Sequence, residues 1–551
     1  MRHGDAGQVD WVASTNTRGE VISGGRREPQ AACSQHAVLG MISWFFRKTF
    51  WNLLGWVKMV LNRPLDIPIP TDTGRVIKPV PLSVAAPAIP IDTILVCHPD
   101  EIPPDERAPP KSRLYKFQVW LYKAFPPMQR GLPAVDADPQ RALKSAFTRL
   151  HRSRYPAPEL PPEFLGSPDL GSLAVRGPYA CYLERESDEV YQWDLMKLGQ
   201  YEHHDGLQKL GAKVLFKVDP VRRALRAFQI DTALGSAGPT DPTCELSKKS
   251  ALCSATTHMS LVRHFNWVHL ANAAPLAVAT RNRLGASHPL CRFLWPYLYG
   301  TQQSNDIITR GQMVRGGEFE SIFSLSFEGM CRLFEESHSE FPMVVNDPEQ
   351  DARRRGIRQQ GFDTPTQDNL EAIFDVLHTH ARRYLQLYYP DALNHSGALL
   401  IRNDASVLAW LDELNSLTPN GVEVTRADVT FDSLARLIAR YMYMATVQHE
   451  LLGSFVWDYQ LWTHRQPVRV YSNGQREPLD VYQRLVNANY NLNVHRRELI
   501  HDFSYLALDE RARAAFAEFN RNLSALQASM EREPWAVWKM YPDVLKVNIN
   551  A

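Results

Sequence analysis

Apolar residues recur at spacings of three and four through most of the chain beyond residue 255, and this pattern restricts the fold more than any other feature. Such spacing places apolar side chains on one face of an α-helix, and that face must be buried against other elements. The clearest helices are expected at Leu370–Leu387, Ser406–Leu414, Phe431–Trp462, Pro478–Leu492 and Asp509–Met530. The sequence therefore predicts a mainly α protein.

Strand-like sequence is sparse by comparison. The best candidate strand is Lys213–Val218, with Ala227–Ile230 as its expected partner. No segment repeats along the chain, which argues against a solenoid. We expect a large single helical domain with few short strands, covering residues 113–551.

Three segments precede that domain. Residues 1–36 are polar, rich in Gly and Arg, and lack the apolar run of a secretory signal, so a disordered leader is expected there. Residues 37–62 are predicted to form an amphipathic apolar helix. Residues 63–112 are dense in proline, which fixes φ and lacks an amide proton, so an extended connector on the surface is expected.

The apolar helix at 37–62 allows two interpretations. Arg47 and Lys48 interrupt its apolar run, so it is not expected to span a membrane. It either packs on the main domain or lies at a membrane surface with aromatic anchors and a basic edge.

Composition excludes some partners. The 61 Lys and Arg residues nearly balance 60 Asp and Glu residues, and no basic stripe indicates a nucleic-acid interface. The seven cysteines are odd in number and scattered, so neither a disulfide framework nor a thiolate zinc site is expected. These features favour a cytoplasmic monomer with no nucleic-acid partner.

Three histidines form a candidate metal site. His264 and His269 lie in RHFNWVH, and His449 lies in MATVQHELLGS. Imidazoles suit divalent iron, manganese, zinc or copper, but composition alone favours ordinary core or surface histidines. Residues five apart on an α-helix diverge by about 140°. A local widening to i→i+5 hydrogen bonding, a rare feature that clusters at functional sites, would bring His264 and His269 together.

The sequence around these histidines resembles the iron-binding helix of the lipoxygenase family. The family pattern is His-x4-His, then Pro, Ala-Thr, Arg-x-Leu, His-Pro and a later Pro. The matching positions, all within HFNWVHLANAAPLAVATRNRLGASHPLCRFLWPYL, are His264, His269, Pro275, Ala279, Thr280, Arg283, Leu284, His288, Pro289 and Pro296. Weaker similarities are found at Gly211–Asp219, Tyr384–Tyr389, Val407–Leu414, Ala515–Gln527 and the C-terminal residues Val547–Ala551.

The resemblance covers residues 113–551, which it identifies as a lipoxygenase-like catalytic domain. The first 110 residues lack alternating strand patterns, so the chain resembles bacterial lipoxygenases that lack the N-terminal β-sandwich. The resemblance implies a non-haem iron bound by His264, His269, His449 and the C-terminal carboxylate of Ala551, with manganese as an alternative. An alanine replaces the usual terminal isoleucine.

Two positions depart from the family pattern. Four residues after the third histidine the family often has Asn, His or Ser, whereas this chain has Gly453, which offers no ligand. If Arg310 matches a family arginine, Thr309 occupies the place of a small residue that admits dioxygen; without a one-residue gap in the alignment, Ile308 occupies it. Met313 and Val314 are candidate pocket-wall residues. The alternative for Met313 and Val314 is ordinary core packing.

The resemblance implies a dioxygenase that forms hydroperoxides from polyunsaturated fatty acids or related lipids by hydrogen abstraction and O2 capture. The departures leave open a hydroperoxide isomerase or an oxidase of a secondary-metabolite lipid chain. A metal-free, non-catalytic lipid-binding homologue is the second alternative. Peripheral contact with a membrane would suit any of these functions.

Overall fold

The computed structural model describes the continuous stretches 66–107, 162–358, 361–390, 396–455, 460–474, 497–532 and 540–547. It also describes scattered positions between residues 40 and 53, between 117 and 160, and at 481, 484 and 485. The leader expected at residues 1–36 and most of the helix expected at Pro478–Leu492 lie outside the described residues. No helix among the described residues is long and apolar enough to cross a bilayer.

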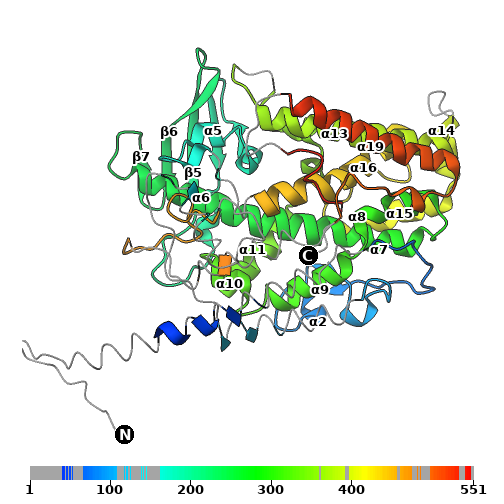
Figure 1. Cartoon of the computed structure of the whole chain (residues 1–551), viewed down its shortest axis with the longest axis horizontal. Coiled ribbons are helices and arrows are strands. Elements are labelled where there is room, and N and C mark those ends of the chain that lie inside the picture. The colour runs from blue at the N-terminus through cyan, green and yellow to red at the C-terminus, as the bar shows by residue number, and fades with distance from the viewer. Residues whose placement is uncertain are drawn as a thin grey trace, which may run out of the picture.

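Helices make up most of the described chain, as the apolar spacing predicts (Figure 1). The α-helices are α2 (Leu82–Ala85), α5 (Leu170–Leu173), α6 (Cys244–His258), α7 (Ala274–Arg283), α8 (Pro289–Leu298), α9 (Thr301–Gly311), α10 (Glu318–Ile322), α11 (Phe327–Ser339), α12 (Pro348–Arg354), α13 (Pro365–Tyr388), α14 (Ser396–Asn403), α15 (Ala405–Leu417), α16 (Phe431–Tyr443) and α19 (Glu510–Met530). The π-helical segments are η5 (Met259–Ala273), η8 (Met444–Gln448) and η9 (Glu450–Phe455). The short 3-10 helices are η1 (Pro99–Glu101), η2 (Pro162–Phe164), η3 (Pro178–Tyr182), η4 (Met196–Gln200), η6 (Met343–Asn346) and η10 (Ser504–Leu506).

A long helix crosses the centre of the molecule and forms its most enclosed element (Figure 1). It runs from α6 through η5 into α7, without a break between Cys244 and Arg283. Every side chain of η5 except that of Trp267 is buried, because η5 contacts α6, α7, α9, α11, η8 and η9. A helix surrounded in this way has no solvent-exposed face, so its polar side chains, among them His264 and His269, are buried together with its apolar ones.

A second helical layer lies beside the central helix. α13 contacts both α16 and α19, and Figure 1 shows α19 running alongside α13. α16 begins with a capping box, in which Thr430 Oγ1 accepts from the Ser433 amide and Ser433 Oγ accepts from the Thr430 amide. From Phe431 the helix continues through η8 and η9 to Phe455. The layer thus carries the third histidine of the predicted site back to the central helix.

The few strands form two small antiparallel sheets. The strands are β1 (Val80–Pro81), β2 (Leu95–Val96), β3 (Glu184–Arg185), β4 (Val190–Asp194), β5 (Ala212–Asp219), β6 (Ala224–Thr232) and β7 (Gly235–Ala237). The larger sheet has the order β3-β4-β5-β6-β7 and contacts α5 and α6. Val214 on β5 faces Ile230 on β6, which confirms the strand pair expected from the sequence.

The proline-rich connector expected at the surface is instead part of the core in its described portion. Ile89, Ile91 and Ile94 are fully buried in the main hydrophobic cluster. Glu106 forms a buried ion pair with Arg281 of α7, with an oxygen–nitrogen distance of 2.7 Å. The proline content correctly predicted an irregular backbone. The apolar residues between the prolines are buried in the core, because burial removes their side chains from water.

Residues near position 66 are joined to residues near position 500. The Tyr505 hydroxyl donates to the Ile67 carbonyl at 2.7 Å, and Arg497 forms an ion pair with Asp66. These partners lie more than four hundred positions apart in the sequence. Residues near position 66 are therefore held in place by residues near position 500.

Candidate metal centre

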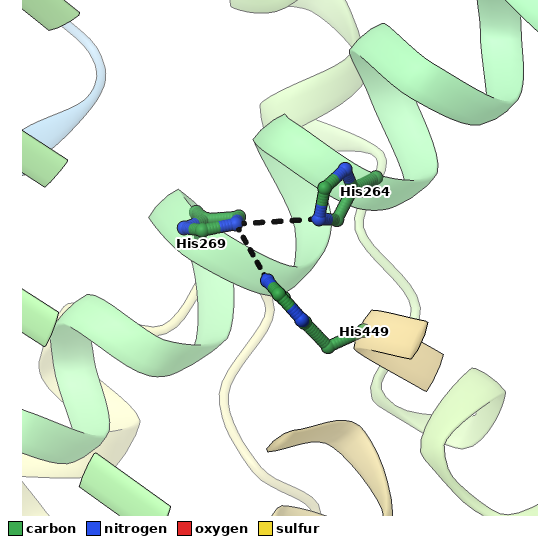
Figure 2. A group of neighbouring side chains, drawn as sticks. All are labelled: His264, His269 and His449. Atoms are coloured by element: carbon green, nitrogen blue, oxygen red, sulfur yellow. Dashed lines mark hydrogen bonds between the residues drawn. The ribbon is translucent and has the colours of Figure 1, made fainter. Parts of the chain in front are cut away.

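The three histidines of the sequence motif converge at the centre of the molecule (Figure 2). His269 Nε2 lies 3.4 Å from His264 Nε2 and 3.2 Å from His449 Nε2. One ring nitrogen from each histidine lies within 4.8 Å of the other two, and all three residues are buried. Two distant helical segments thus present three imidazoles to one point.

The π-helical geometry of η5 explains how His264 and His269 share one face. In η5 the backbone forms i→i+5 hydrogen bonds, and the Ala274 amide donates to the His269 carbonyl at the end of the segment. Residues five apart then lie nearly above one another and do not diverge as they would on an α-helix. The widening expected from the spacing of the two histidines is confirmed.

The third histidine also lies beside π-helical turns, on the helix that continues from α16. His449 lies between the π-helical segments η8 and η9, and η9 contacts η5 directly. π-Helical turns are rare and occur mostly at functional sites. Their presence on both elements of the cluster indicates that the backbone is distorted to aim these side chains.

The spacing of the nitrogen atoms fits a shared metal ion. Two nitrogen ligands about 2.1 Å from one ion, at an angle of about 90° to 110°, are about 3.0 to 3.4 Å apart. The observed separations of 3.2 and 3.4 Å fall in that range. The donor set suits divalent iron, manganese or zinc.

Asn305 of α9 fixes the orientation of His269. The Asn305 side-chain amide donates to the His269 carbonyl at 3.1 Å, which turns its oxygen toward His269 Nδ1, 3.3 Å away. When Nδ1–H donates to that oxygen, Nε2 is left with a lone pair for a metal. Asn305 could not be predicted from the sequence, because nothing in the local sequence of α9 shows which face meets η5.

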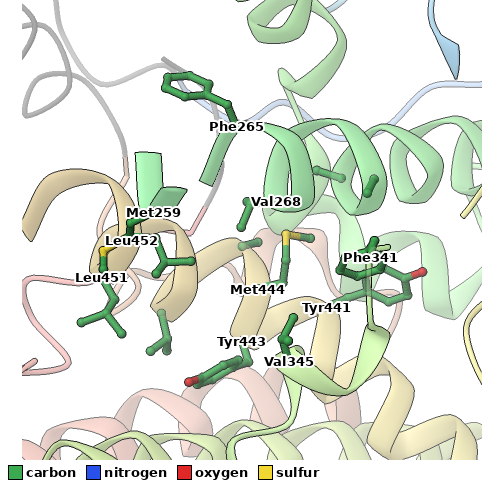
Figure 3. Packing of buried hydrophobic residues seen from close by; sticks show 14 of the residues in the cluster. Met259, Phe265, Val268, Phe341, Val345, Tyr441, Tyr443, Met444, Leu451 and Leu452 are labelled. Carbon is green, nitrogen blue, oxygen red and sulfur yellow. The ribbon is translucent and has the colours of Figure 1, made fainter. Parts of the chain in front are cut away.

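Buried apolar side chains pack on the two helical segments that carry the histidines (Figure 3). The labelled side chains include Met259, Phe265 and Val268 from η5, and Met444 and Leu451 from the α16–η9 helix, and all are nearly fully buried. The Phe265 ring stacks on the His269 ring at 5.5 Å between centroids. This packing keeps water away from the three imidazoles.

Gly453 lies against His264, which explains why a glycine stands where the family often has a ligand. A Cβ atom placed at Gly453 would lie 2.9 Å from His264 Cε1 and 3.0 Å from His264 Nε2. Carbon atoms do not approach an imidazole this closely without displacing it. Any side chain at this position therefore requires the ring or the helix to move.

The predicted oxygen and substrate positions lie on α9 or directly after it, in or against the hydrophobic core. Thr309 is buried on α9, and its hydroxyl donates to the Asn305 carbonyl at 2.8 Å, one turn from the amide that holds His269. Met313 is buried in the main hydrophobic core, and Val314 packs against that core. Arg310 pairs with Asp306 on the same helix. The pocket roles of Thr309, Met313 and Val314 remain predictions.

The fourth predicted ligand, Ala551, lies outside the described residues. The described chain reaches Val547, which is buried and whose amide donates to the Arg497 carbonyl at 3.0 Å. The terminal segment is thus tied to the body up to four residues before the C-terminal carboxylate.

Comparisons with known proteins agree with this architecture. No protein-family model matches the chain. The chain is 26% identical over 187 residues to "Lipoxygenase 2, chloroplastic" of Tanacetum cinerariifolium, covering 31% of this chain and 20% of that protein. It is 24% identical over 234 residues to "Polyunsaturated fatty acid lipoxygenase ALOX15" of Bos taurus, covering 42% of this chain and 34% of that protein. The aligned regions thus span about a fifth to a third of these relatives.

Solved structures match over a larger share. A lipoxygenase carrying the change Delta413-417:GS superposes with a TM-score of 0.69 at 14% identity, over 84% of this chain and 78% of that chain. A calcium-dependent 11R-lipoxygenase gives a TM-score of 0.66 at 16% identity, again over 84% and 78%. The helical body around the three buried histidines is therefore a lipoxygenase-type fold. The sequence relatives that match part of the chain are also lipoxygenases.

Proposed function

We propose that this chain is a non-haem iron dioxygenase that converts polyunsaturated fatty acids, or related lipids, into hydroperoxides. The observation that carries the proposal is the convergence of His264, His269 and His449 from two π-helical segments. Support for the substrate class comes from a structural relative, the Delta413-417:GS lipoxygenase in complex with arachidonate, with a TM-score of 0.69. The names of the curated relatives point the same way.

The roles of the chain's own residues follow from their contacts. The three histidines would hold the ion through Nε2, and Asn305 would keep His269 in the required tautomer. The bound iron would supply hydrogen-atom abstraction from a doubly allylic carbon and the matching change of oxidation state. Apolar residues of η5 and η9, among them Phe265 and Leu451, would exclude water from the substrate radical until dioxygen is captured.

Metal analysis combined with oxygen uptake tests the proposal. We expect about one iron per chain and oxygen consumption with linoleate or arachidonate, both lost in His449→Ala because one of three imidazoles is removed. His380→Phe is the matched control, since His380 is a buried histidine on α13 outside the cluster. A folded His449→Ala protein with full iron content would refute the ligand assignment.

The carboxylate of Ala551 is proposed as a fourth ligand. Adding residues after Ala551 turns this carboxylate into an amide, which is a neutral and weaker ligand. We expect a C-terminally extended protein to lose iron, while an N-terminally tagged protein keeps it. Equal iron content in the two proteins would exclude Ala551 as a ligand.

A hydroperoxide isomerase is the second candidate. Gly453 removes a side-chain ligand, and buried Thr309 stands near Asn305 where the family has a smaller residue. Both departures would hinder ordinary dioxygenation. Oxygen-electrode assays with linoleate and with its hydroperoxide separate the two functions, because consumption of the hydroperoxide without oxygen uptake indicates isomerisation.

A further inference from the structure

Two helical segments near the start of the chain expose an unusual number of large apolar side chains. The described positions between 40 and 53 are helical, and their exposed apolar residues include Phe45, Phe46 and Leu53, with Phe46 at 64% exposure. Described positions between 117 and 124 are also helical, and expose Phe117 and Trp120, with Trp120 at 59%. Large apolar groups gathered in this way mark a contact surface.

Contacts between the two segments make these side chains one surface. The Phe50 and Phe125 rings meet edge to face at 5.6 Å, and the Arg47 guanidinium lies 4.8 Å above the Phe125 ring. On the second segment, the Phe117 and Trp120 rings stack at 5.7 Å. We call the exposed residues of the two segments the aromatic patch; they are Met41, Ile42, Phe45, Phe46, Phe50, Leu53, Phe117 and Trp120.

The sequence around the aromatic patch is exclusively basic in its charge. Residues 37–63 contain Arg47, Lys48, Lys58 and Arg63 and no acidic residue. Residues 111–125 contain Lys111, Arg113, Lys116 and Lys123 and again no acidic residue. The whole chain carries a net charge of only +1, so this concentration of positive charge is local.

We infer that the aromatic patch docks on the surface of a bilayer that contains anionic phospholipid. Phe and Trp side chains insert favourably at the boundary between headgroups and acyl chains, and neighbouring Lys and Arg residues are attracted to anionic headgroups. Association with a second copy of the chain through this surface is disfavoured, because it would bring two uniformly basic segments together. The inference does not depend on the proposed catalytic function.

Flotation of the full-length protein with vesicles tests this inference. We expect the protein to float with phosphatidylcholine vesicles that contain phosphatidylglycerol, and to bind pure phosphatidylcholine vesicles much less. Raised salt should weaken binding, by roughly fivefold for each basic residue whose attraction is lost. This comparison needs no variant, so it does not depend on the folding of a mutant.

Substitutions then locate the contact. The triple variant Phe45→Ser, Phe46→Ser, Trp120→Ser should bind anionic vesicles about tenfold less or worse, because three apolar side chains lose their burial. The control is Leu399→Ser, Leu400→Ser on α14, which removes two exposed leucines at the opposite end of the molecule (Figure 1). Iron content and thermal unfolding should be unchanged in both variants.

Three results would overturn the inference. These are equal binding to both vesicle types, equal loss of binding in the α14 control, and a wild-type dimer in solution that the triple variant converts to a monomer. Loss of vesicle binding together with retained oxygen uptake on free fatty acid would support docking separately from catalysis. Docking with no activity on any fatty acid would contradict only the proposed function.

Discussion

The position of Gly453 relative to His264 makes the size of this single residue critical to the metal centre. A Cβ at Gly453 would lie 2.9 Å from His264 Cε1. Forcing an extra methyl group into a packed core costs about 1 to 3 kcal/mol, and here the nearest group to move is a predicted ligand. Gly453 therefore offers no side-chain ligand itself, and its lack of a Cβ allows His264, a predicted ligand, to keep its position.

We expect Gly453→Ala to lower iron affinity about tenfold or more, because the His264 ring must shift away from the other two imidazoles. Competitive metal titration with a chelator measures the change. Gly238→Ala is a suitable control, since its Cβ would meet no atom closer than 3.9 Å. An unchanged iron affinity in Gly453→Ala would mean that the helix backbone shifts to make room for the new methyl group and that the His264 ring stays in place.

At the scale of single residues, the sequence predicted His264, His269 and His449 because the ordered family motif surrounds the first two. It could not predict Asn305, because its contact with His269 depends on how α9 packs across η5. Nor could it predict that Gly453 touches His264, since these residues lie on different helices. Contacts of this kind arise from packing and leave no local pattern.

At the scale of elements, α16 is anchored by a buried carboxylate. Asp347 is fully buried, caps α12 by accepting from the Gln350 amide, and pairs with Arg436 and Arg440 of α16. Burial by itself would raise the pKa of Asp347, but the hydrogen bonds from Arg436 outweigh it and hold that pKa below its usual value. This ion pair fixes the helix that leads to His449.

We expect Asp347→Asn to lower the free energy of unfolding by about 3 to 5 kcal/mol, because two arginines lose the charge that compensates them. Urea unfolding monitored by circular dichroism measures the loss. Asp432→Asn on α16 removes the exposed partner of Arg382 on α13 and should cost less than about 1 kcal/mol. Equal effects of the two substitutions would refute the anchoring role of Asp347.

Apolar spacing predicted α13, α15 and α19 within a few residues, because each has one buried and one exposed face. It also predicted the start of α16 at Phe431, but the helix expected to reach Trp462 is described only to Phe455, the end of η9. The same method could not foresee the burial of Ile89, Ile91 and Ile94, because three isoleucines among prolines have no helical or strand period. The π-helical turn at η5 was predicted only through the spacing of its two histidines.

At the scale of the whole molecule, buried histidines link stability to pH. Burial lowers the pKa of His258 and His380 to about 3 and that of His338 to about 4. An unfolded histidine has a pKa of about 6.5, so the folded protein keeps these imidazoles neutral while the unfolded chain takes up protons. The contribution of these neutral imidazoles to the free energy of unfolding is complete above about pH 6.5. It is lost as the pH falls from there toward 4.

We expect each of these imidazoles to remove about 2 kcal/mol of unfolding free energy between about pH 7.5 and pH 5. Urea unfolding at a series of pH values measures the slope. His380→Phe, which keeps the aromatic stack on Phe519, should reduce the loss by about 2 kcal/mol. A slope that is identical in wild type and His380→Phe would show that His380 is protonated without unfolding.

The bonds between residues near 66 and residues near 500 have a consequence for synthesis of the protein. Ile67 cannot meet Tyr505, nor Asp66 meet Arg497, until nearly the whole chain has left the ribosome. Until then the isoleucines at 89, 91 and 94 have no completed core to enter, and exposed apolar segments of this kind aggregate. Nascent chains of this protein should accordingly depend on chaperones for most of their translation, and premature termination should yield insoluble fragments.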